Sequence, residues 1–293
     1  MQVVLRGLLV FIGYWPLVVL HALGWFTGTA LWWFPNSLRR GTRIHVELCL
    51  PGTPLEQRRR IARRSLIESM KGLLEAPAIW FGPRWRLRRW MGGASARDAM
   101  RKALAQAPSA IFLTPHLGSW ELAGQFVAEF SRVTVLYKPQ DSVFDPLILA
   151  GRARNPNARL VPTTTGGVKA LLGALRNGEA VGILPDHDPP PGSGRFAPFF
   201  GIPAHTTDLV GKLAARTDAG VWFLVAERRP WARGFQLHLT PAPAGIRERK
   251  QSVAALNRGV EACILRLPEQ YWWSYKRYRR QPTGRGSPYT LRG

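Results

Sequence analysis

The chain has 293 residues, of which 46% are hydrophobic, and its 41 lysines and arginines against 18 aspartates and glutamates give a formal net charge of +23. This apolar fraction supports a substantial core and excludes a disordered polyelectrolyte. The positive charge calls for an anionic partner: nucleic acid, a phospholipid surface, an acidic protein or a phosphorylated substrate. Cys49 and Cys263 lie far apart without a CxxC motif, which disfavours a disulfide framework or a cysteine zinc site and favours a reducing compartment.

The chain begins with a long uncharged segment. No Asp, Glu, Lys or Arg occurs between Arg6 and Arg39, and residues 8–34 are mainly Leu, Val, Phe and Trp. About 20 apolar residues span a bilayer, so we expect a membrane-anchoring helix within residues 1–40, bent at Pro16. A cleaved signal peptide and a buried core helix are the alternatives. More arginines follow the segment than precede it, which by the positive-inside rule predicts that the rest of the chain lies in the cytosol.

A second stretch, residues 80–90, interleaves aromatic and basic side chains. They are Trp80, Phe81, Arg84, Trp85, Arg86, Arg88, Arg89 and Trp90. A helix at a membrane surface would seat such rings at the headgroup level with guanidinium groups near phosphates. Stacking on nucleic acid uses the same residue types, and an ordinary solvated helix face is a third interpretation. The nearby apolar segment favours lipid.

Beyond the apolar segment, the spacing of hydrophobic residues predicts a helix over 53–80, followed from residue 98 by helices that alternate with short apolar strands. The expected helices are 98–106, 119–130, 167–177, 207–217 and 251–267. The expected strands are 110–114, 133–137, 180–184, 221–226 and 235–240. Apolar strands between amphipathic helices are typical of an α/β sheet covered on both faces.

A histidine and a glutamate follow the strand predicted at 110–114. His116 stands at the end of this strand, and Glu121 comes five residues later, after a turn at Gly118. An imidazole can act as a base while a carboxylate orients it, so the two residues form a plausible dyad. An unbroken helix would point them about 140° apart, so the glycine turn is needed to bring them together. A structural, hydrogen-bonding histidine is the alternative.

Two carboxylates follow the strand predicted at 180–184, where a site would open in an α/β sheet. They are Asp186 and Asp188, on either side of His187. A divalent metal held by both carboxylates, as in a nucleotide-sugar transferase, and an acidic loop tip are the physical alternatives.

The segment around His116 resembles the HxxxxD/E motif of the glycerolipid acyltransferases, and specifically that of the lipid A biosynthesis acyltransferases, which add secondary acyl chains. Further similar segments follow in the family's order. They are Tyr137-Lys138-Pro139, Gly151-Arg152-Ala153-Arg154-Asn155, Ala174-Leu175-Arg176-Asn177-Gly178-Glu179, Pro185-Asp186-His187-Asp188, Ala197-Pro198-Phe199-Phe200-Gly201 and Pro268-Glu269-Gln270-Tyr271-Trp272-Trp273. The resemblance covers residues 1–282.

This resemblance implies a glycerolipid acyltransferase-like mixed sheet flanked by helices, with a membrane anchor over 1–40, an acyltransferase domain over 41–282 and a flexible tail over 283–293. It implies transfer of a fatty acyl chain from acyl carrier protein to a hydroxyacyl group of a phosphorylated lipid A precursor. The expected location is the cytoplasmic face of a bacterial inner membrane, in contact with its lipid. No cofactor, metal or nucleic-acid partner is implied.

The resemblance also implies roles for single residues. His116 matches the catalytic base and Glu121 the residue that holds it. The candidates for stabilising the oxyanion or binding phosphate are Arg152, Arg154 and Lys138, although such cations also make ordinary surface contacts. The candidates for acceptor binding or catalytic support are Asp186, Asp188 and Ser119.

Three other functions share parts of this pattern. A glycerophospholipid acyltransferase would use the same chemistry, but its usual aspartate is Glu121 here and an FPEGTR segment is missing from the sequence. A metal-dependent glycosyltransferase would act through Asp186 and Asp188 and lose activity with a chelator. A basic, membrane-tethered binding protein would need no catalytic His116.

Overall fold

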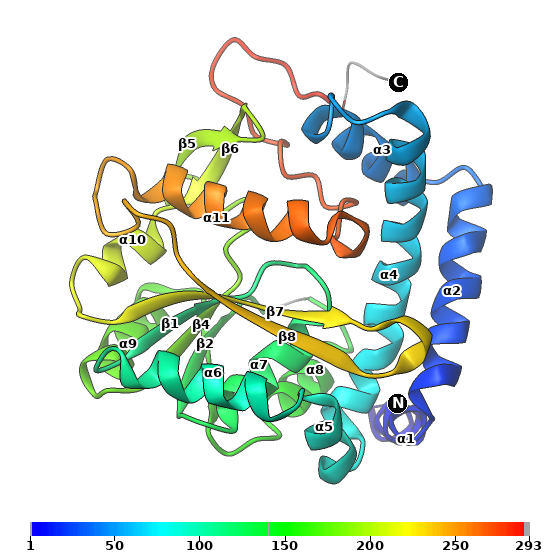
Figure 1. Cartoon of the computed structure of the whole chain (residues 1–293), viewed down its shortest axis with the longest axis horizontal. Helices are drawn as coiled ribbons and strands as arrows, with labels where there is room; N and C mark the ends of the chain where they lie inside the picture. The colour runs from blue at the N-terminus through cyan, green and yellow to red at the C-terminus, as the bar shows by residue number, and fades with distance from the viewer. Residues whose placement is uncertain (1, 140, 290–293) are drawn as a thin grey trace.

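The computed structural model describes residues 2–139 and 141–289. A six-stranded sheet in the order β3-β2-β4-β1-β7-β8 forms its centre, and a two-stranded hairpin, β5-β6, lies apart from it (Figure 1). The strands are β1 (Ala110–Leu113), β2 (Val133–Tyr137), β3 (Ala158–Pro162), β4 (Ala180–Ile183), β5 (Gly194–Phe199), β6 (Ile202–Thr207), β7 (Gly220–Arg228) and β8 (Phe235–Pro241). All neighbouring pairs in the large sheet are parallel except β7 and β8, which are antiparallel.

Helices flank this sheet, so the predicted mixed α/β architecture is confirmed. The helices are α1 (Gln2–Gly13), α2 (Leu17–Trp33), α3 (Ser37–Cys49), α4 (Leu55–Phe81), α5 (Arg84–Trp90), α6 (Ala94–Ala105), α7 (Trp120–Ala128), α8 (Asp145–Arg152), α9 (Thr165–Arg176), α10 (Leu209–Ala214) and α11 (Ser252–Arg266), with short 3-10 helices η1 (Pro230–Ala232) and η2 (Pro268–Gln270). Every helix and strand expected between residues 53 and 267 is present within a few residues.

The structure also contains elements that the sequence patterns did not predict: α3, α8, β3 and the hairpin β5-β6. Strand β3 lies at an edge of the sheet, where Val161 is its one buried residue, so it lacks the apolar run of a central strand. In the hairpin, Pro198 lies opposite Pro203. Proline removes a backbone donor and weakens the sequence signal for a strand.

Both faces of the central sheet are buried. In β1, Ile111 and Leu113 pack with residues of α9, α10 and α11, while the alternating Ala110 and Phe112 pack with residues of α6 and α7. Figure 1 shows α11 on one side of the sheet and α6 and α7 on the other. Burial of both faces accounts for the continuous apolar character of this strand.

The uncharged N-terminal segment forms two helices instead of one. Helices α1 and α2 are bent by 109° where Pro16 interrupts them, and α2 lies along α4 (Figure 1). None of the described helices is by itself long and apolar enough to cross a bilayer. Helices α1 and α2 together have the length and apolar composition for it, but they are sharply bent. Helix α2 can pack closely on α4 because Gly24 and Gly28 have no side chain. A Cβ at either position would overlap Lys71 or Ile67 of α4. Membrane anchoring by this segment stays a prediction.

The outer side of α2 is apolar and exposed. Phe26, Trp33 and Phe34 expose 64%, 68% and 69% of their surface. Large contiguous apolar patches of this kind usually mark a surface that contacts lipid or a partner.

The aromatic and basic stretch over residues 80–90 is partly buried and partly exposed. Trp90 is buried, and the Arg86 guanidinium donates to the carbonyls of Gly13, Tyr14 and Trp15 just after α1. Trp85 is exposed. Arg86 joins α5 to the end of α1, and membrane contact by the exposed side chains of this stretch stays a prediction.

A buried cluster of charges connects α2 and α4 to the turn that follows β1. Arg228 of β7 donates two hydrogen bonds to Glu75 of α4, at 2.8 and 2.9 Å, and one to the carbonyl of Gly118 at 2.9 Å. Glu75 also lies 2.9 Å from Nε2 of His21 in α2. Burial opposes ionisation of Glu75, but Arg228 and His21 outweigh it and lower its pKa to about 2.

The end of the described chain is anchored at Tyr289. Its side chain is buried, and its hydroxyl accepts a hydrogen bond from the backbone N–H of Tyr278 at 3.1 Å and contacts His45. The flexible tail expected over 283–293 is therefore held at this position. Residues 290–293 of that tail lie outside the described residues.

Gly118 forms the turn between β1 and α7 with a φ of +62°. A Cβ at this position would lie 2.2 Å from the carbonyl oxygen of Ala226, so Gly118→Ala combines backbone strain with a clash. We expect it to destabilise the fold by more than about 2 kcal/mol. Thermal unfolding of the detergent-solubilised protein measures this.

The control is Gly173→Ala in α9, where a Cβ meets nothing within 4 Å. It should leave the unfolding temperature unchanged or raise it, because alanine favours a helix over glycine by about 1 kcal/mol. Equal effects of the two substitutions would contradict the role given to the turn.

Candidate active site

Parallel pairing of β1 with β4 brings His116 and Asp186 together. Leu113 lies opposite Ile183 at the carboxyl ends of these two strands, and His116 and Asp186 each follow three residues later. Nδ1 of His116 lies 2.9 Å from Oδ1 of Asp186, and the backbone N–H of His116 donates to Oδ2 at 2.9 Å. The carboxyl ends of the strands are where ligands bind in open α/β sheets.

The Asp186 carboxylate fixes the orientation of the imidazole. Burial opposes its ionisation, but the charge and hydrogen bonds of His116 outweigh this and hold the pKa of Asp186 well below its usual range. An ionised carboxylate only accepts hydrogen bonds, so Nδ1 of His116 is the donor. In the neutral imidazole, Nε2 then carries the lone pair that can take a proton.

Aromatic rings enclose the His116 imidazole. His187 stacks on it with ring centroids 4.0 Å apart, and Trp120 and Trp272 lie at 5.2 and 5.4 Å. The backbone carbonyl of His116 accepts a hydrogen bond from the N–H of Trp272. These contacts leave the ring little freedom to rotate away from Asp186.

His187 is exposed, and its ring lies 4.0 Å from that of His116 and 4.5 Å from that of Tyr275, centroid to centroid. Desolvation is the largest cause of its lowered pKa; the charges of His116, Arg277 and Lys138 act in the same direction, and that of Asp186 opposes them. Lys138, a candidate for phosphate binding, is thus one of the cations whose charge disfavours protonation of His187.

Glu121 holds Arg152 instead of His116. Arg152 donates from Nη2 to Oε1 at 2.5 Å and from Nε at 3.1 Å, and the indole of Trp80 donates to Oε2 at 2.9 Å. In the described part of the chain no hydrogen bond joins Glu121 to His116. The structure therefore places Asp186, and not Glu121, in contact with His116, because Glu121 lies in the first turn of α7 and turns toward Trp80 of α4 and Arg152 of α8.

Charge pairing keeps Glu121 ionised. Burial opposes its ionisation, but Arg152 and, to a smaller extent, Trp80 and His116 lower its pKa. Arg152 uses Nε and Nη2 for this contact, and among the described residues Nη1 has no hydrogen-bond partner. A guanidinium edge fixed in this way can receive an anionic oxygen.

Arg154 has a structural position. Its guanidinium donates to the carbonyls of Ile79 at 2.5 Å and Gly82 at 2.8 Å, at the C-terminal end of α4. These are carbonyls that a helix end leaves without partners. The prediction that Arg154 faces an oxyanion or phosphate is thus not supported by where its donors point.

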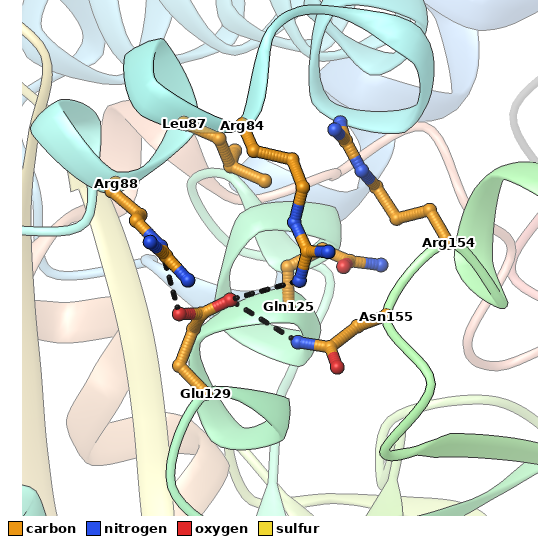
Figure 2. Close-up of a pocket in the computed structure, with 7 residues that line it drawn as sticks. All are labelled: Arg84, Leu87, Arg88, Gln125, Glu129, Arg154 and Asn155. Carbon is orange, nitrogen blue, oxygen red and sulfur yellow. Dashed lines mark hydrogen bonds and ion pairs between the residues drawn. The ribbon is translucent and has the colours of Figure 1, made fainter.

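Arg154 also borders a small polar pocket between α5 and α7. Figure 2 shows its lining residues, which are Arg84, Leu87, Arg88, Gln125, Glu129, Arg154 and Asn155. Glu129 accepts hydrogen bonds from Arg88 and Asn155, both at 3.2 Å, and lies 4.0 Å from Arg84. The cluster is internally satisfied and ties α5 to α7.

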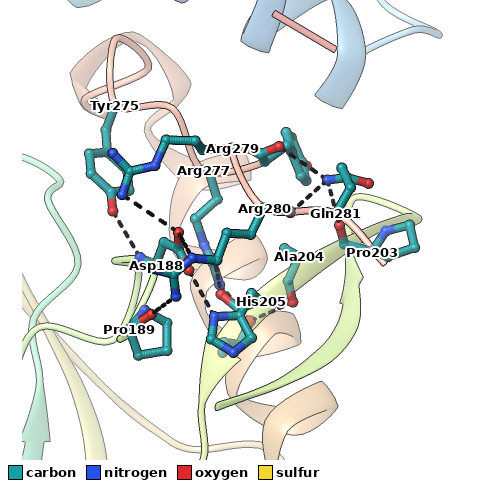
Figure 3. A network of polar contacts seen from close by, with 12 residues as sticks. Asp188, Pro189, Pro203, Ala204, His205, Tyr275, Arg277, Arg279, Arg280 and Gln281 are labelled. Atoms are coloured by element: carbon teal, nitrogen blue, oxygen red, sulfur yellow. Dashed lines mark hydrogen bonds and ion pairs between the residues drawn. The ribbon is translucent and has the colours of Figure 1, made fainter. Parts of the chain in front are cut away.

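Asp186 and Asp188 belong to different networks. Asp188 lies 2.8 Å from Nδ1 of His205, and its backbone N–H donates to the Tyr275 hydroxyl at 2.9 Å. Figure 3 shows Asp188 facing the arginines near the end of the chain, with Nε of Arg280 3.5 Å from Oδ2. Within residues 2–139 and 141–289, no group of three or more His, Cys, Asp or Glu side chains is arranged to hold a metal ion. The Asp188 carboxylate contacts His205 and lies near Arg280, so its position gives no support to the predicted role in acceptor binding.

Ser119 lies directly between the glycine turn and α7. Its backbone N–H donates to the Ala226 carbonyl at 2.7 Å, and its buried hydroxyl has no hydrogen-bond partner among the described residues. An unpaired buried hydroxyl is unusual in a folded protein, but Ser119 is 2% exposed, so its position gives no support to the predicted role in acceptor binding.

Several residues of the site were not predicted as functional. Trp120, His187 and Trp272 surround His116, and Trp80 and Arg228 hold Glu121 and the Gly118 turn. His187 and Trp272 lie within segments that carried the family resemblance. Trp80 and Arg228 act across long sequence separations, which no local pattern reveals.

Comparison with known proteins gives a consistent result along nearly the whole chain. The family described as bacterial lipid A biosynthesis acyltransferase matches residues 3–280. The chain is 30% identical over 279 residues to an Escherichia coli lipid A biosynthesis lauroyltransferase, covering 94% of this chain and 90% of that protein. It is 28% identical to the E. coli palmitoleoyltransferase, over 94% and 89% of the two chains, and 24% identical to the myristoyltransferase, over 92% and 83%.

Proposed function

The chain belongs to the bacterial lipid A biosynthesis acyltransferases and is an acyltransferase, and from this premise we propose its donor, acceptor and catalytic base. The donor is an acyl carrier protein thioester, and the acceptor is the hydroxyl of a hydroxyacyl chain on a phosphorylated lipid A precursor. The observation that carries the mechanism is the Asp186-held imidazole of His116 at the carboxyl ends of β1 and β4.

In the proposed reaction, Nε2 of His116 takes the proton of the acceptor hydroxyl as its oxygen attacks the thioester carbonyl. A tetrahedral oxyanion forms and then collapses, breaking the carbon–sulfur bond. The leaving thiolate of the carrier receives the proton from the imidazolium, which restores the neutral base. Asp186 stabilises the imidazolium and keeps Nδ1 protonated throughout.

Arg152 is the proposed donor for the oxyanion or for an acceptor phosphate. Glu121, which itself accepts a hydrogen bond from Trp80, holds the guanidinium in place, so its free edge is oriented before substrate arrives. Donors that are fixed in advance stabilise developing charge most effectively. Lys138 is the second candidate, because its charge acts on His187 beside the base.

We place the enzyme at the cytoplasmic face of a bacterial inner membrane, with α1 and α2 in contact with lipid. The support is the exposed apolar side of α2, the bend at Pro16 and the arginines that follow the apolar segment. The formal charge of +23 is suited to an acidic carrier protein and a phosphorylated lipid, because both would be attracted electrostatically.

The test of this proposal is product analysis with the purified full chain in neutral detergent. Incubation with acyl-loaded carrier protein and a phosphorylated, tetra-acylated acceptor should yield a lipid heavier by one ester-linked acyl chain, detected by mass spectrometry. For comparison, the coenzyme A thioester of the same fatty acid is used as the donor, and it should react more slowly than the carrier-protein thioester. A product formed equally fast from both donors would contradict the carrier-protein assignment.

A further inference from the structure

A cavity of 760 Å³ lies between the start of α3 and the end of the described chain. The residues that line it are Pro35, Asn36, Ser37, Arg39, Arg40, Gly41, Arg43, Ile44, Glu47, Lys276 and Tyr289. This volume falls within the range of about 300–1,000 Å³ that is typical of small-ligand sites. The lining, which we call the α3 groove, shares no residue with the His116 site.

Positive charge dominates the α3 groove. Arg39, Arg40, Arg43 and Lys276 contribute four cations, whereas Glu47 is the single carboxylate in the lining. Arg43 lies three and four residues after Arg40 and Arg39, so the three arginines share one side of α3. Such a concave cluster concentrates positive potential and favours an anion.

The corner between α2 and α3 is rigid, which sets the position of these arginines. The Asn36 side chain accepts a hydrogen bond from the backbone N–H of Arg39 and donates to the carbonyls of Leu31 and Phe34, both at 2.7 Å. It therefore caps the start of α3 and fastens it to the end of α2. A groove held this way is formed before any ligand binds.

The α3 groove adjoins the exposed apolar side of α2. Trp33 and Phe34 end that helix, and Pro35, the next residue, already lines the groove. Where an apolar surface enters a bilayer, the residues at its border lie at the level of the lipid headgroups. The junction of exposed aromatic rings with clustered arginines therefore matches the border between acyl chains and phosphates.

We propose that the α3 groove binds the headgroup phosphate of an anionic phospholipid of the surrounding bilayer. The cations of Arg40, Arg43 and Lys276 pair with the phosphate and its negative neighbours, while Trp33 and Phe34 contact the acyl chains. The proposal shares the membrane location with the proposed function but does not depend on the acyl-transfer chemistry. The bound lipid is a docking partner and not the acceptor.

The test compares two short-chain lipids that have the same acyl chains but different headgroup charge. The detergent-solubilised full chain is titrated with dihexanoyl phosphatidylglycerol and with dihexanoyl phosphatidylcholine, and the shift of its unfolding temperature is followed. The wild-type protein should be stabilised more by the anionic lipid, and high salt should weaken this difference.

The variant carries Arg40→Gln, Arg43→Gln and Lys276→Gln, all at exposed positions. Its affinity for phosphatidylglycerol should fall by about tenfold or more, since each cation near a phosphate contributes roughly a factor of five. The matched control carries Arg159→Gln, Lys169→Gln and Arg176→Gln, exposed cations on β3 and α9 that remove the same total charge. It should bind like the wild type.

Equal losses in both triple variants would overturn the proposal, because they would show attraction by bulk charge alone. Equal stabilisation of the wild type by the two lipids would overturn it as well. A second measurement asks whether the groove binds the acceptor. It determines the KM for the phosphorylated acceptor in neutral detergent micelles, which the groove variant should leave unchanged. A raised KM there would reassign the groove to the acceptor, whereas acyl transfer failing in every protein would affect only the proposed function.

Discussion

Asp186→Asn should lower kcat for acyl transfer on the order of 10³–10⁴-fold while the protein remains folded. The carboxylate now accepts a hydrogen bond from Nδ1 of His116 and so leaves Nε2 unprotonated. An asparagine amide can instead donate to Nδ1, which favours the tautomer with the proton on Nε2, where it cannot act as a base. Single-turnover transfer rates and thermal unfolding of the same preparation measure the two effects separately.

The matched control is Asp188→Asn, the same substitution two residues further along. Asp188 contacts His205 and Tyr275 and is not bonded to His116, so its replacement should reduce kcat by no more than about tenfold, although it will cost some stability. If the two variants lose activity equally, Asp186 is not the residue that orients the base.

Arg228→Met should destabilise the fold by about 3–5 kcal/mol, a large part of the stability of a typical domain. It removes the arginine partner of Glu75, whose side chain is 1% exposed, and so leaves the buried carboxylate with His21 as its one remaining partner among the described residues. It also removes the hydrogen bond to the Gly118 carbonyl in the turn next to His116. Thermal unfolding in detergent should show a much lower midpoint, and activity should fall with it.

Two further variants separate this effect from the general loss of an arginine. Arg60→Met breaks the exposed pair with Glu269 and should cost less than about 1 kcal/mol, because water screens surface ion pairs. Adding Glu75→Gln to Arg228→Met should restore part of the lost stability, since the neutral amide no longer carries an unpaired charge. No recovery in that double variant would mean that burial of the Glu75 charge is not the cause.

Much of the fold follows from local patterns, because its central strands are apolar on both faces and its helices are amphipathic. The strands that end before His116 and Asp186 were both predicted, and so was the opening of a site after each of them. The pairing of the two residues was not, because it requires β4 to lie beside β1. Strand order depends on how the connecting helices pack, and no local stretch of sequence encodes it.

The same reason explains why the sequence paired His116 with Glu121, whereas the structure shows its contact with Asp186. Glu121 is its neighbour in sequence, whereas Asp186 is its neighbour in space at a separation of 70 residues. Arg154 and Trp80 illustrate the point as well. Arg154 donates to backbone carbonyls at the end of α4, and Trp80 donates to the Glu121 carboxylate. The bend at Pro16 was predictable from proline chemistry, but the close seating of α2 on α4 depends on contacts at Gly24 and Gly28.

The most direct measurement is single-turnover product formation by His116→Ala, followed by mass spectrometry with acyl-loaded carrier protein and the phosphorylated acceptor. A folded variant whose unfolding temperature matches the wild type should form no acylated lipid above the uncatalysed background, because the group that takes the hydroxyl proton is gone. Product formation by that folded variant at the wild-type rate would contradict the assignment of His116 as the base.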